Sequence, residues 1–155
     1  DAPNKTVFDD ICKPKWNQGA WEKFEQTIDL MPSLDTRTVC RHTLIKGKNM
    51  SHEHIREFAE LDNRADPDYI EAKGYVHVGH SQENLAASNM PSHEDIMAFS
   101  REIAPLTNRQ VLDESRPSRV ALIGTEVIPI QVPEAEMYFP VDLGIAPPVK
   151  HLPVI

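Results

Sequence analysis

Apolar residues recur at helical spacing in three parts of the chain. Residues 19–31 carry one such stripe, and Pro32 would end that helix. Ser51 is the predicted N-cap of a second helix, which runs to about residue 61. Ser92 is the predicted N-cap of a third helix, in which Asp95 completes a capping box with aspartate in place of glutamate.

Segments rich in β-branched and apolar residues predict the strands. These segments are residues 37–46, 69–78, 109–113 and 118–124, with Arg116 and Pro117 in the turn between the last two. Residues 1–17 hold two prolines and several charges and are predicted to be irregular. Because helices and strands alternate, we expect an α/β fold with a largely parallel sheet and covering helices.

The last part of the chain has a different composition. We divide the chain into an α/β domain over residues 1–124 and a Pro-rich tail over residues 125–155, which holds six prolines among apolar residues and shows no helical period. The tail is predicted to lie extended over the domain or over a neighbouring chain, and disorder near its end is the alternative.

The segment "YIEAKGYVHVGHS", residues 69–81, predicts a strand with two unlike faces. Its odd positions are polar or aromatic and its even positions are apolar: Glu71, Lys73, Tyr75 and His77 alternate with Ile70, Ala72, Gly74, Val76 and Val78. Burying the charged side under helices would cost several kcal/mol for each unpaired charge. Two interpretations remain open, an edge strand with one solvated face and a strand that lines a cavity.

Composition and charge narrow the classes of protein. The formal net charge of −8 argues against a chain that holds nucleic acid by itself, although nucleic acid can still be a substrate. No apolar run approaches the roughly 18 residues that span a bilayer, and no signal peptide is visible in the sequence. The chain begins at Asp1, which is typical of a processed, engineered or partial chain. Its two cysteines, Cys12 and Cys40, fit a reducing cytoplasm or one disulfide, and Cys40 is predicted to be a buried thiol.

Few residues indicate a metal site or a catalytic site by their type and spacing. His77, His80 and His93, or His52 and His54, could offer nitrogen ligands, but neither set is completed by cysteines or paired carboxylates, so no metal site is predicted. The common nucleotide-binding, hydrolase and metalloprotease motifs are missing. Lys73 is the one candidate for a covalent amine, and a charge partner for Glu71 is the commoner role of such a lysine.

Several motifs in order resemble a known family. The segments "DAPNKTVFDDICKP", "AWEKFEQTIDLM", "RTVCRHTLIKGKNM", "ADPDYIEAKGYVHVGHS", "NMPSHEDIMAF" and "SRVALIG" resemble the C-terminal half of tRNA 4-demethylwyosine synthases, which are radical S-adenosylmethionine enzymes. The match covers about residues 1–124, and "KGYVHVGHS…NMPSHE" in the wyosine base formation region is its most specific part. The Pro-rich tail does not match.

The resemblance implies the C-terminal part of a partial (β/α)6 radical-SAM barrel. It also implies a lyase that condenses carbons of pyruvate onto N1-methylguanosine-37 of phenylalanine tRNA, with S-adenosylmethionine and [4Fe–4S] clusters in the complete enzyme. The family's CxxxCxxC motif is not in this sequence, and two cysteines cannot hold such a cluster. We therefore expect a chain that is inactive without the missing N-terminal half and that could self-associate.

The resemblance also implies roles for individual residues. Five are candidates for S-adenosylmethionine contacts: Arg41, Thr43, Asn49, Val78 and Gly79. Six are candidates for contacts to substrate or RNA: Tyr75, His77, His80, Ser81, His93 and Arg119. Lys73 is the candidate amine for an imine with pyruvate. The alternatives are a stand-alone, non-catalytic module that binds RNA or a partner, and an unrelated α/β enzyme.

Overall fold

The computed structural model describes residues 1–15 and 18–128. Most of the predicted tail, residues 129–155, lies outside the described residues. The described helices are α1 (Lys5–Cys12), α2 (Ala20–Leu30), α3 (His52–Ala65) and α4 (His93–Leu106), and the described strands are β1 (Val39–Leu44), β2 (Tyr69–Gly74), β3 (Gln110–Ser115) and β4 (Val120–Gly124). Single 3-10 turns cover Met31–Ser33, Gly79–Glu83 and Ala87–Asn89. None of the described helices has the length and apolarity needed to cross a membrane.

The four strands form one sheet in the order β1-β2-β4-β3. β1 and β2 are parallel, whereas β4 is antiparallel to both β2 and β3. The prediction of a largely parallel sheet was therefore wrong, and the sheet is mixed. The reason is the short connection from Ser115 to Val120, which allows a hairpin but is far too short for a parallel crossover. The predicted turn is present, with Arg119 N donating to Arg116 O at 3.2 Å.

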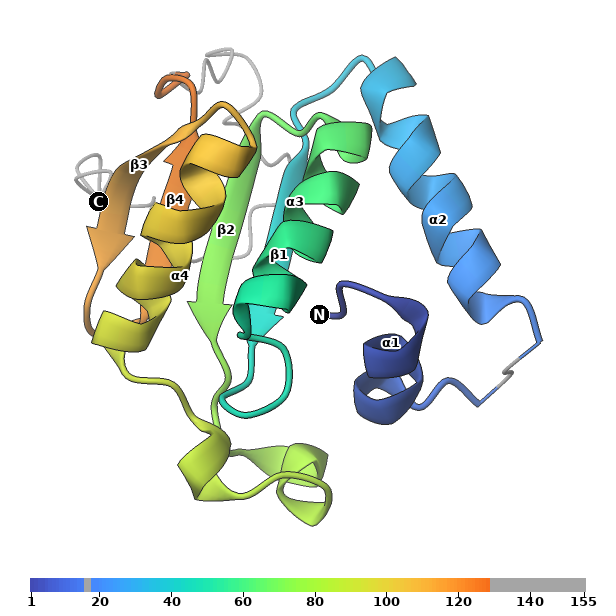
Figure 1. Ribbon diagram of the computed structural model, residues 1–155, viewed down its shortest axis with the longest axis vertical. Helices are drawn as coiled ribbons and strands as arrows, with labels where there is room; N and C mark the ends of the chain where they lie inside the picture. The colour runs from blue at the N-terminus through green and yellow to red at the C-terminus, as the bar shows by residue number, and fades with distance from the viewer. Residues whose placement is uncertain (16–17, 129–155) are drawn as a thin grey trace, which may run out of the picture.

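The long helices α3 and α4 pack side by side on the same face of the sheet (Figure 1). Under them lies the apolar core, which every described strand except β3 supplies with fully or nearly fully buried side chains: Cys40, Leu44, Ile70, Ala72, Ala121 and Ile123. α2 packs against α3 and adds Ile28 to this core. The alternation along each strand therefore places one set of side chains under helices and the other set on the opposite face.

The N-terminal segment is more regular than its sequence suggested. Residues 1–17 were predicted to be irregular, but Lys5–Cys12 forms α1, capped by Asn4, whose Oδ1 accepts from Val7 N at 2.9 Å. Phe8 holds this helix against α2 through ring contacts at 5.5 Å to Trp21 and 6.0 Å to Phe24. A helix this short depends on such tertiary contacts, which explains why the local pattern did not reveal it.

The predicted helix caps are confirmed. Ser51 Oγ accepts from His54 N at 3.2 Å at the start of α3. At the start of α4, Ser92 Oγ accepts from Asp95 N at 3.1 Å, and Asp95 Oδ2 accepts from Ser92 N at 2.9 Å, which is the capping box expected from the sequence. The hydrogen bond from Ser92 is the main cause that lowers the pKa of Asp95.

Candidate functional site

The face of the sheet opposite α3 and α4 carries a block of polar side chains on its parallel strands. Arg41 is paired in register with Glu71, and Thr43 is paired with Lys73. Arg41 Nε donates to Glu71 Oε2 at 2.6 Å, and Glu71 is the more enclosed partner, with 17% of its side chain exposed against 59% for Arg41. This bond uses Nε, so the two Nη groups of Arg41 keep donors for an anion.

Strand β2 lies in the interior of the sheet, with β1 on one side and β4 on the other. The edge-strand interpretation of residues 69–78 was therefore wrong. The strand also ends at Gly74 and not at residue 78. Gly74 N still donates to Arg119 O and Tyr75 N to Leu44 O, both at 2.9 Å, and beyond these bonds the chain leaves the sheet.

Beyond the carboxyl end of β2, three of the predicted site residues come together. The hydroxyl of Tyr75 lies 3.1 Å from His77 Nδ1 and 3.1 Å from Ser81 Oγ. The ring of Tyr75 is only 5% exposed, so Tyr75 does not line an open wall as predicted but turns inward and offers its hydroxyl to the loop. The alternation of the sequence could not show this, because the strand has already ended at Gly74.

The loop that follows β1 is held closed by Asn49. This fully buried side chain accepts from Ile45 N at 2.7 Å and donates to Thr43 O at 2.9 Å and to Asp1 O at 2.8 Å. Both N–H donors of the amide and one lone pair of its oxygen are therefore used within the chain. The Asn49 side chain therefore shapes this loop, and the cofactor contact predicted for Asn49 stays a prediction.

The other predicted site residues are dispersed. His93 is 4% exposed in α4, with Nε2 at 3.3 Å from Glu114 Oε2, so the direct RNA contact predicted for His93 does not fit this buried position. Arg119 is half-buried, and its Nη1 donates to Pro91 O at 3.1 Å. His80 is on the surface, with a fully exposed side chain next to Glu83.

The two remaining candidates, Val78 and Gly79, follow the Tyr75 cluster. Val78 is 61% exposed, and its carbonyl accepts from Ser81 Oγ at 2.6 Å. Gly79 has a φ of 59°, in the left-handed region that favours glycine. The two residues therefore form a tight, exposed turn at the same end of the sheet as the loop after β1.

A cavity of about 500 Å³ between the beginnings of α3 and α4 was not predicted as a site. Its walls include Lys46, Lys48, His52 and His54. Lys46 Nζ lies 3.0 Å from Asp95 Oδ2, and His52 Nδ1 lies 2.6 Å from Glu102 Oε1, so acidic partners already balance part of this basic charge. The "KGKNM" segment was the available signal, since it follows directly after a strand.

The cysteines do not suit iron–sulfur ligation. Cys40 is buried and Cys12 is exposed, both as free thiols, so the disulfide alternative was wrong and the buried thiol predicted for Cys40 is confirmed. Burial raises the pKa of the Cys40 thiol to about 12, with Asp62 as a further cause. A cluster needs at least three thiolates, so the residues of this chain do not fit a [4Fe–4S] group. The described residues also contain no cluster of three potential metal ligands.

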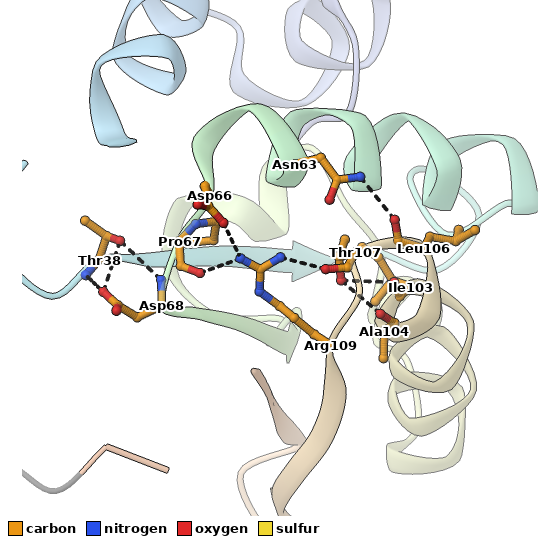
Figure 2. A network of polar contacts seen from close by, with 10 residues as sticks. All are labelled: Thr38, Asn63, Asp66, Pro67, Asp68, Ile103, Ala104, Leu106, Thr107 and Arg109. Carbon is orange, nitrogen blue, oxygen red and sulfur yellow. Dashed lines mark hydrogen bonds and ion pairs between the residues drawn. The ribbon is translucent and has the colours of Figure 1, made fainter. Parts of the chain in front are cut away.

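The opposite end of the sheet is tied together by Arg109, as Figure 2 shows. Its side chain is 7% exposed. It donates to Asp66 Oδ1 at 3.0 Å, to Pro67 O at 2.7 Å and to Thr107 O at 2.9 Å. These bonds join the connection before β2 to the end of α4. Sequence reasoning did not single out this arginine, because its partners are mainly backbone carbonyls that the fold brings to it.

Comparison with known proteins identifies most of this region. Residues 64–125 match the family model described as wyosine base formation. This segment of the chain is therefore similar to the wyosine base formation family. The matched residues run from the end of α3 through β2, α4 and β3 to the end of β4, and they include the Tyr75 cluster and Lys73.

Curated relatives of the chain are named tRNA 4-demethylwyosine synthases. The chain is 40% identical over 123 residues to the S-adenosyl-L-methionine-dependent tRNA 4-demethylwyosine synthase of Pyrococcus abyssi, covering 79% of this chain and 35% of that protein. It is 38% identical over 126 residues to the Methanocaldococcus jannaschii synthase, covering 81% and 39%. The chain therefore spans little more than a third of the length of these relatives, and its resemblance to the synthases is confirmed over about 80% of its residues.

Two solved structures resemble this fold. A structure of TYW1 with a lysine-pyruvate adduct bound matches with a TM-score of 0.70 and 33% identity, covering 81% of this chain and 38% of that chain. A crystal structure of archaeal TYW1 matches with a TM-score of 0.62 and 29% identity, covering 81% and 37%. The α/β arrangement of the described residues is therefore that of a substantial part of TYW1.

Proposed function

We propose that this chain is the substrate-side part of an enzyme that builds the wyosine base on tRNA. The observation that carries the proposal is the match of residues 64–125 to the wyosine base formation family, together with 40% identity to a tRNA 4-demethylwyosine synthase. The matched segment holds the central strand β2 and the polar loop at its carboxyl end, which is where α/β folds bind their ligands.

We further propose that the sheet is part of the wall of a partial (β/α)6 radical-SAM barrel. In such a barrel helices cover the outside and the other face of the strands lines the interior. The arrangement here is consistent with that geometry, since α3 and α4 share one face and the polar block of Arg41, Glu71 and Lys73 lies on the other. In this proposal the second interpretation of the two-faced strand, a cavity wall, is the right one.

The [4Fe–4S] clusters of the proposed enzyme would be held elsewhere, because the two cysteines here do not fit them. A cluster of this kind supplies the electron that starts radical chemistry from bound S-adenosylmethionine. On the S-adenosylmethionine side, the free Nη donors of Arg41 suit a carboxylate. Thr43, Val78 and Gly79 offer backbone and hydroxyl contacts nearby, and Asn49 would act through the loop that it holds. This chain alone is proposed to be inactive.

Lys73 is the proposed amine for pyruvate. The related TYW1 structure carries a lysine-pyruvate adduct, and Lys73 is the one lysine in the four described strands. It lies beside Thr43 in the register of the sheet, on the face that carries Arg41. An amine forms an imine with a ketone only when it is deprotonated.

We propose tRNA as the macromolecular partner and the cytoplasm as its location, as for other tRNA-modifying enzymes. His80 and Ser81, in the exposed turn after β2, and the half-buried Arg119 remain candidates for RNA contacts. The net charge of −8 makes a strong hold on tRNA by this chain alone unfavourable. A partner that covers the polar face, either the missing N-terminal half or a second copy of this chain, is therefore part of the proposal.

The test is the nucleoside composition of tRNA. Nucleosides from cells that express this chain, analysed by mass spectrometry, should contain a wyosine derivative. Cells in which the gene is disrupted should accumulate N1-methylguanosine instead, and the intact gene should restore the derivative. Unchanged nucleosides after disruption would overturn the proposal. If purified chain still bound tRNA in that case, the non-catalytic binding module would be the better description.

A further inference from the structure

The loop after β2 contains a chain of three hydrogen bonds whose directions can be worked out. Ser81 Oγ lies 2.6 Å from the carbonyl oxygen of Val78, which can only accept. The single hydroxyl proton of Ser81 is therefore committed to Val78. Ser81 Oγ can then bond the Tyr75 hydroxyl, 3.1 Å away, only by accepting the proton of Tyr75.

Because Tyr75 donates its proton to Ser81, the ring nitrogen of His77 that carries the hydrogen is also determined. Tyr75 Oη also lies 3.1 Å from Nδ1 of His77, and with its own proton directed to Ser81 it can only accept there. Nδ1 must therefore carry a hydrogen, and in a neutral imidazole Nε2 then has none. When neutral His77 carries its hydrogen on Nδ1, the contacts Ser81–Val78, Tyr75–Ser81 and His77–Tyr75 are all hydrogen bonds.

The lone pair on Nε2 of His77 is accessible. The ring is half-buried, Nε2 has no hydrogen-bond partner among the described residues, and this atom is not fully buried. In His54 and His93, by contrast, the ring nitrogen without a hydrogen-bond partner, Nδ1, is buried. His80 is fully exposed beside Glu83 and has no comparable support.

We propose that His77 is the proton acceptor of this site, and that Tyr75 and Ser81 are its positioning residues. An N–H or O–H group of the bound substrate gives its proton to Nε2, which leaves the substrate atom with the electron pair and His77 as imidazolium. The proton then passes to solvent through the accessible side of the ring. This inference rests on the proposed function, because it assigns a role within that reaction.

The hydrogen-bond chain suits this task in two ways. Protonation at Nε2 leaves the bond from Nδ1 to Tyr75 Oη in place, so no group has to rotate. Each bond in the chain also makes the next acceptor stronger, because Tyr75 Oη accepts better while its own proton is donated to Ser81. A base oriented by a second group, itself fixed by a third, is a recurring arrangement in catalytic sites.

The first test needs no activity and uses the chain itself. Nitrogen-15 NMR distinguishes the two tautomers of neutral histidine, and a His77→Gln sample identifies the His77 signals. We expect the hydrogen on Nδ1 in the unaltered chain. In Ser81→Ala, the tyrosine proton is released and can turn to Nδ1, so the hydrogen should move to Nε2. Gln82→Ala is the matched control, because Gln82 contacts only the backbone carbonyl of His77.

Two results would overturn the hydrogen-bond assignment. One is a hydrogen on Nε2 in the unaltered chain, and the other is a Ser81→Ala variant with an unchanged tautomer and an intact fold. Tyr75→Phe adds a second variant, in which loss of the acceptor should also abolish the preference for Nδ1. The His80 signals report on the fold of the same loop and should stay constant in every variant.

The second test separates this inference from the proposed function. This test uses the complete protein that the gene encodes. There, His77→Gln should lower the rate of wyosine formation by about 10²- to 10⁴-fold with little change in KM. The decline in rate toward acid pH should also disappear. Ser81→Ala should keep that pH dependence with a smaller loss. If unaltered protein forms wyosine and His77→Gln matches it, this inference fails alone. If unaltered protein forms none, the proposed function fails while the NMR result still stands.

Discussion

The two ends of the sheet in this chain are built in different ways. At the amino end of β2, the buried Arg109 donates to two backbone carbonyls and to Asp66, and it locks two connections together. At the carboxyl end, the hydrogen bonds of the Tyr75 hydroxyl to described residues stay within its own loop, and Nε2 of His77 has no partner among those residues. At the first end the polar groups join distant connections of the fold, whereas at the second they bond within one loop.

The largest expected effect is a loss of stability at the amino end of β2, where Arg109 joins two connections. Arg109→Ala leaves the carbonyls of Pro67 and Thr107 without their donor in a buried place, so we expect a loss of about 2–4 kcal/mol in the free energy of unfolding. Urea denaturation followed by circular dichroism measures it. Arg116→Ala is the matched control, since the ion pair of Arg116 with Glu94 is exposed and should matter little. Equal effects of the two variants would contradict the assigned role of Arg109.

The second expected effect is on the trapping of pyruvate at Lys73, and it leaves the fold intact. In the complete enzyme, borohydride should trap pyruvate on Lys73, and Lys73→Ala should reduce the trapped adduct to background. Lys73→Arg keeps the charge but cannot form the imine, so it should behave like the alanine variant. Mass spectrometry of the trapped peptide provides the measurement. Normal trapping in Lys73→Ala, with an unfolding transition like that of the unaltered protein, would remove Lys73 from the proposed mechanism.

A smaller effect should appear at the beginning of α4, which lies near the carboxyl end of β2 (Figure 1). Ser92→Ala removes the cap and should cost about 1 kcal/mol. Its partner Asp95 has a lowered pKa, chiefly through Ser92, so the ionised carboxylate is the stabilising form. That contribution is present above the ordinary pKa of 3.8 and is lost as the pH falls below it. Acid titration of the unfolding free energy should be flatter in Asp95→Asn, and an unchanged titration would refute this.

The smallest effect concerns the ion pair of the polar block. Glu71→Gln should cost only about 0.5 kcal/mol, because Arg41 is more than half exposed and solvent screens the pair. If the block binds an anion, the same variant should free Arg41 Nε and tighten the binding of S-adenosylmethionine to the complete enzyme. Isothermal titration measures the change. A cost above 2 kcal/mol would show that this pair belongs to the framework, as the Arg109 network does.

Local sequence patterns gave correct predictions where the stabilising interactions join neighbouring residues. The serine caps at residues 51 and 92 were predicted because their hydrogen bonds span only three residues. The beginning of β2 was predicted from alternation, whereas its predicted end at residue 78 lies beyond the observed end at Gly74. The burial of Tyr75 and His93 was missed, and His93 bonds to Glu114, which lies 21 residues away in the sequence.

The mixed sheet was missed for a related reason. A run of short strands and helices favours parallel pairing, and nothing in the strand residues states the direction of a partner. The short connection between β3 and β4 decides it, together with the core that places β4 beside β2. The role of Asn49 is a similar case, since its partners include Asp1 at the other end of the N-terminal segment.

The sequence by itself determined the α/β class, the helix starts, the two-faced character of residues 69–74 and the family resemblance. These follow from periodicity, capping and motif order, which are properties of neighbouring residues. Only the tertiary structure decided that β2 lies inside a mixed sheet, that Arg109 locks one end of it, and that Tyr75 turns inward to hold His77 at the other. The reason is that strand direction and the Arg109 bonds depend on partners that folding brings together from distant parts of the chain, and that the Tyr75 bonds depend on the strand ending at Gly74, which its alternation does not show.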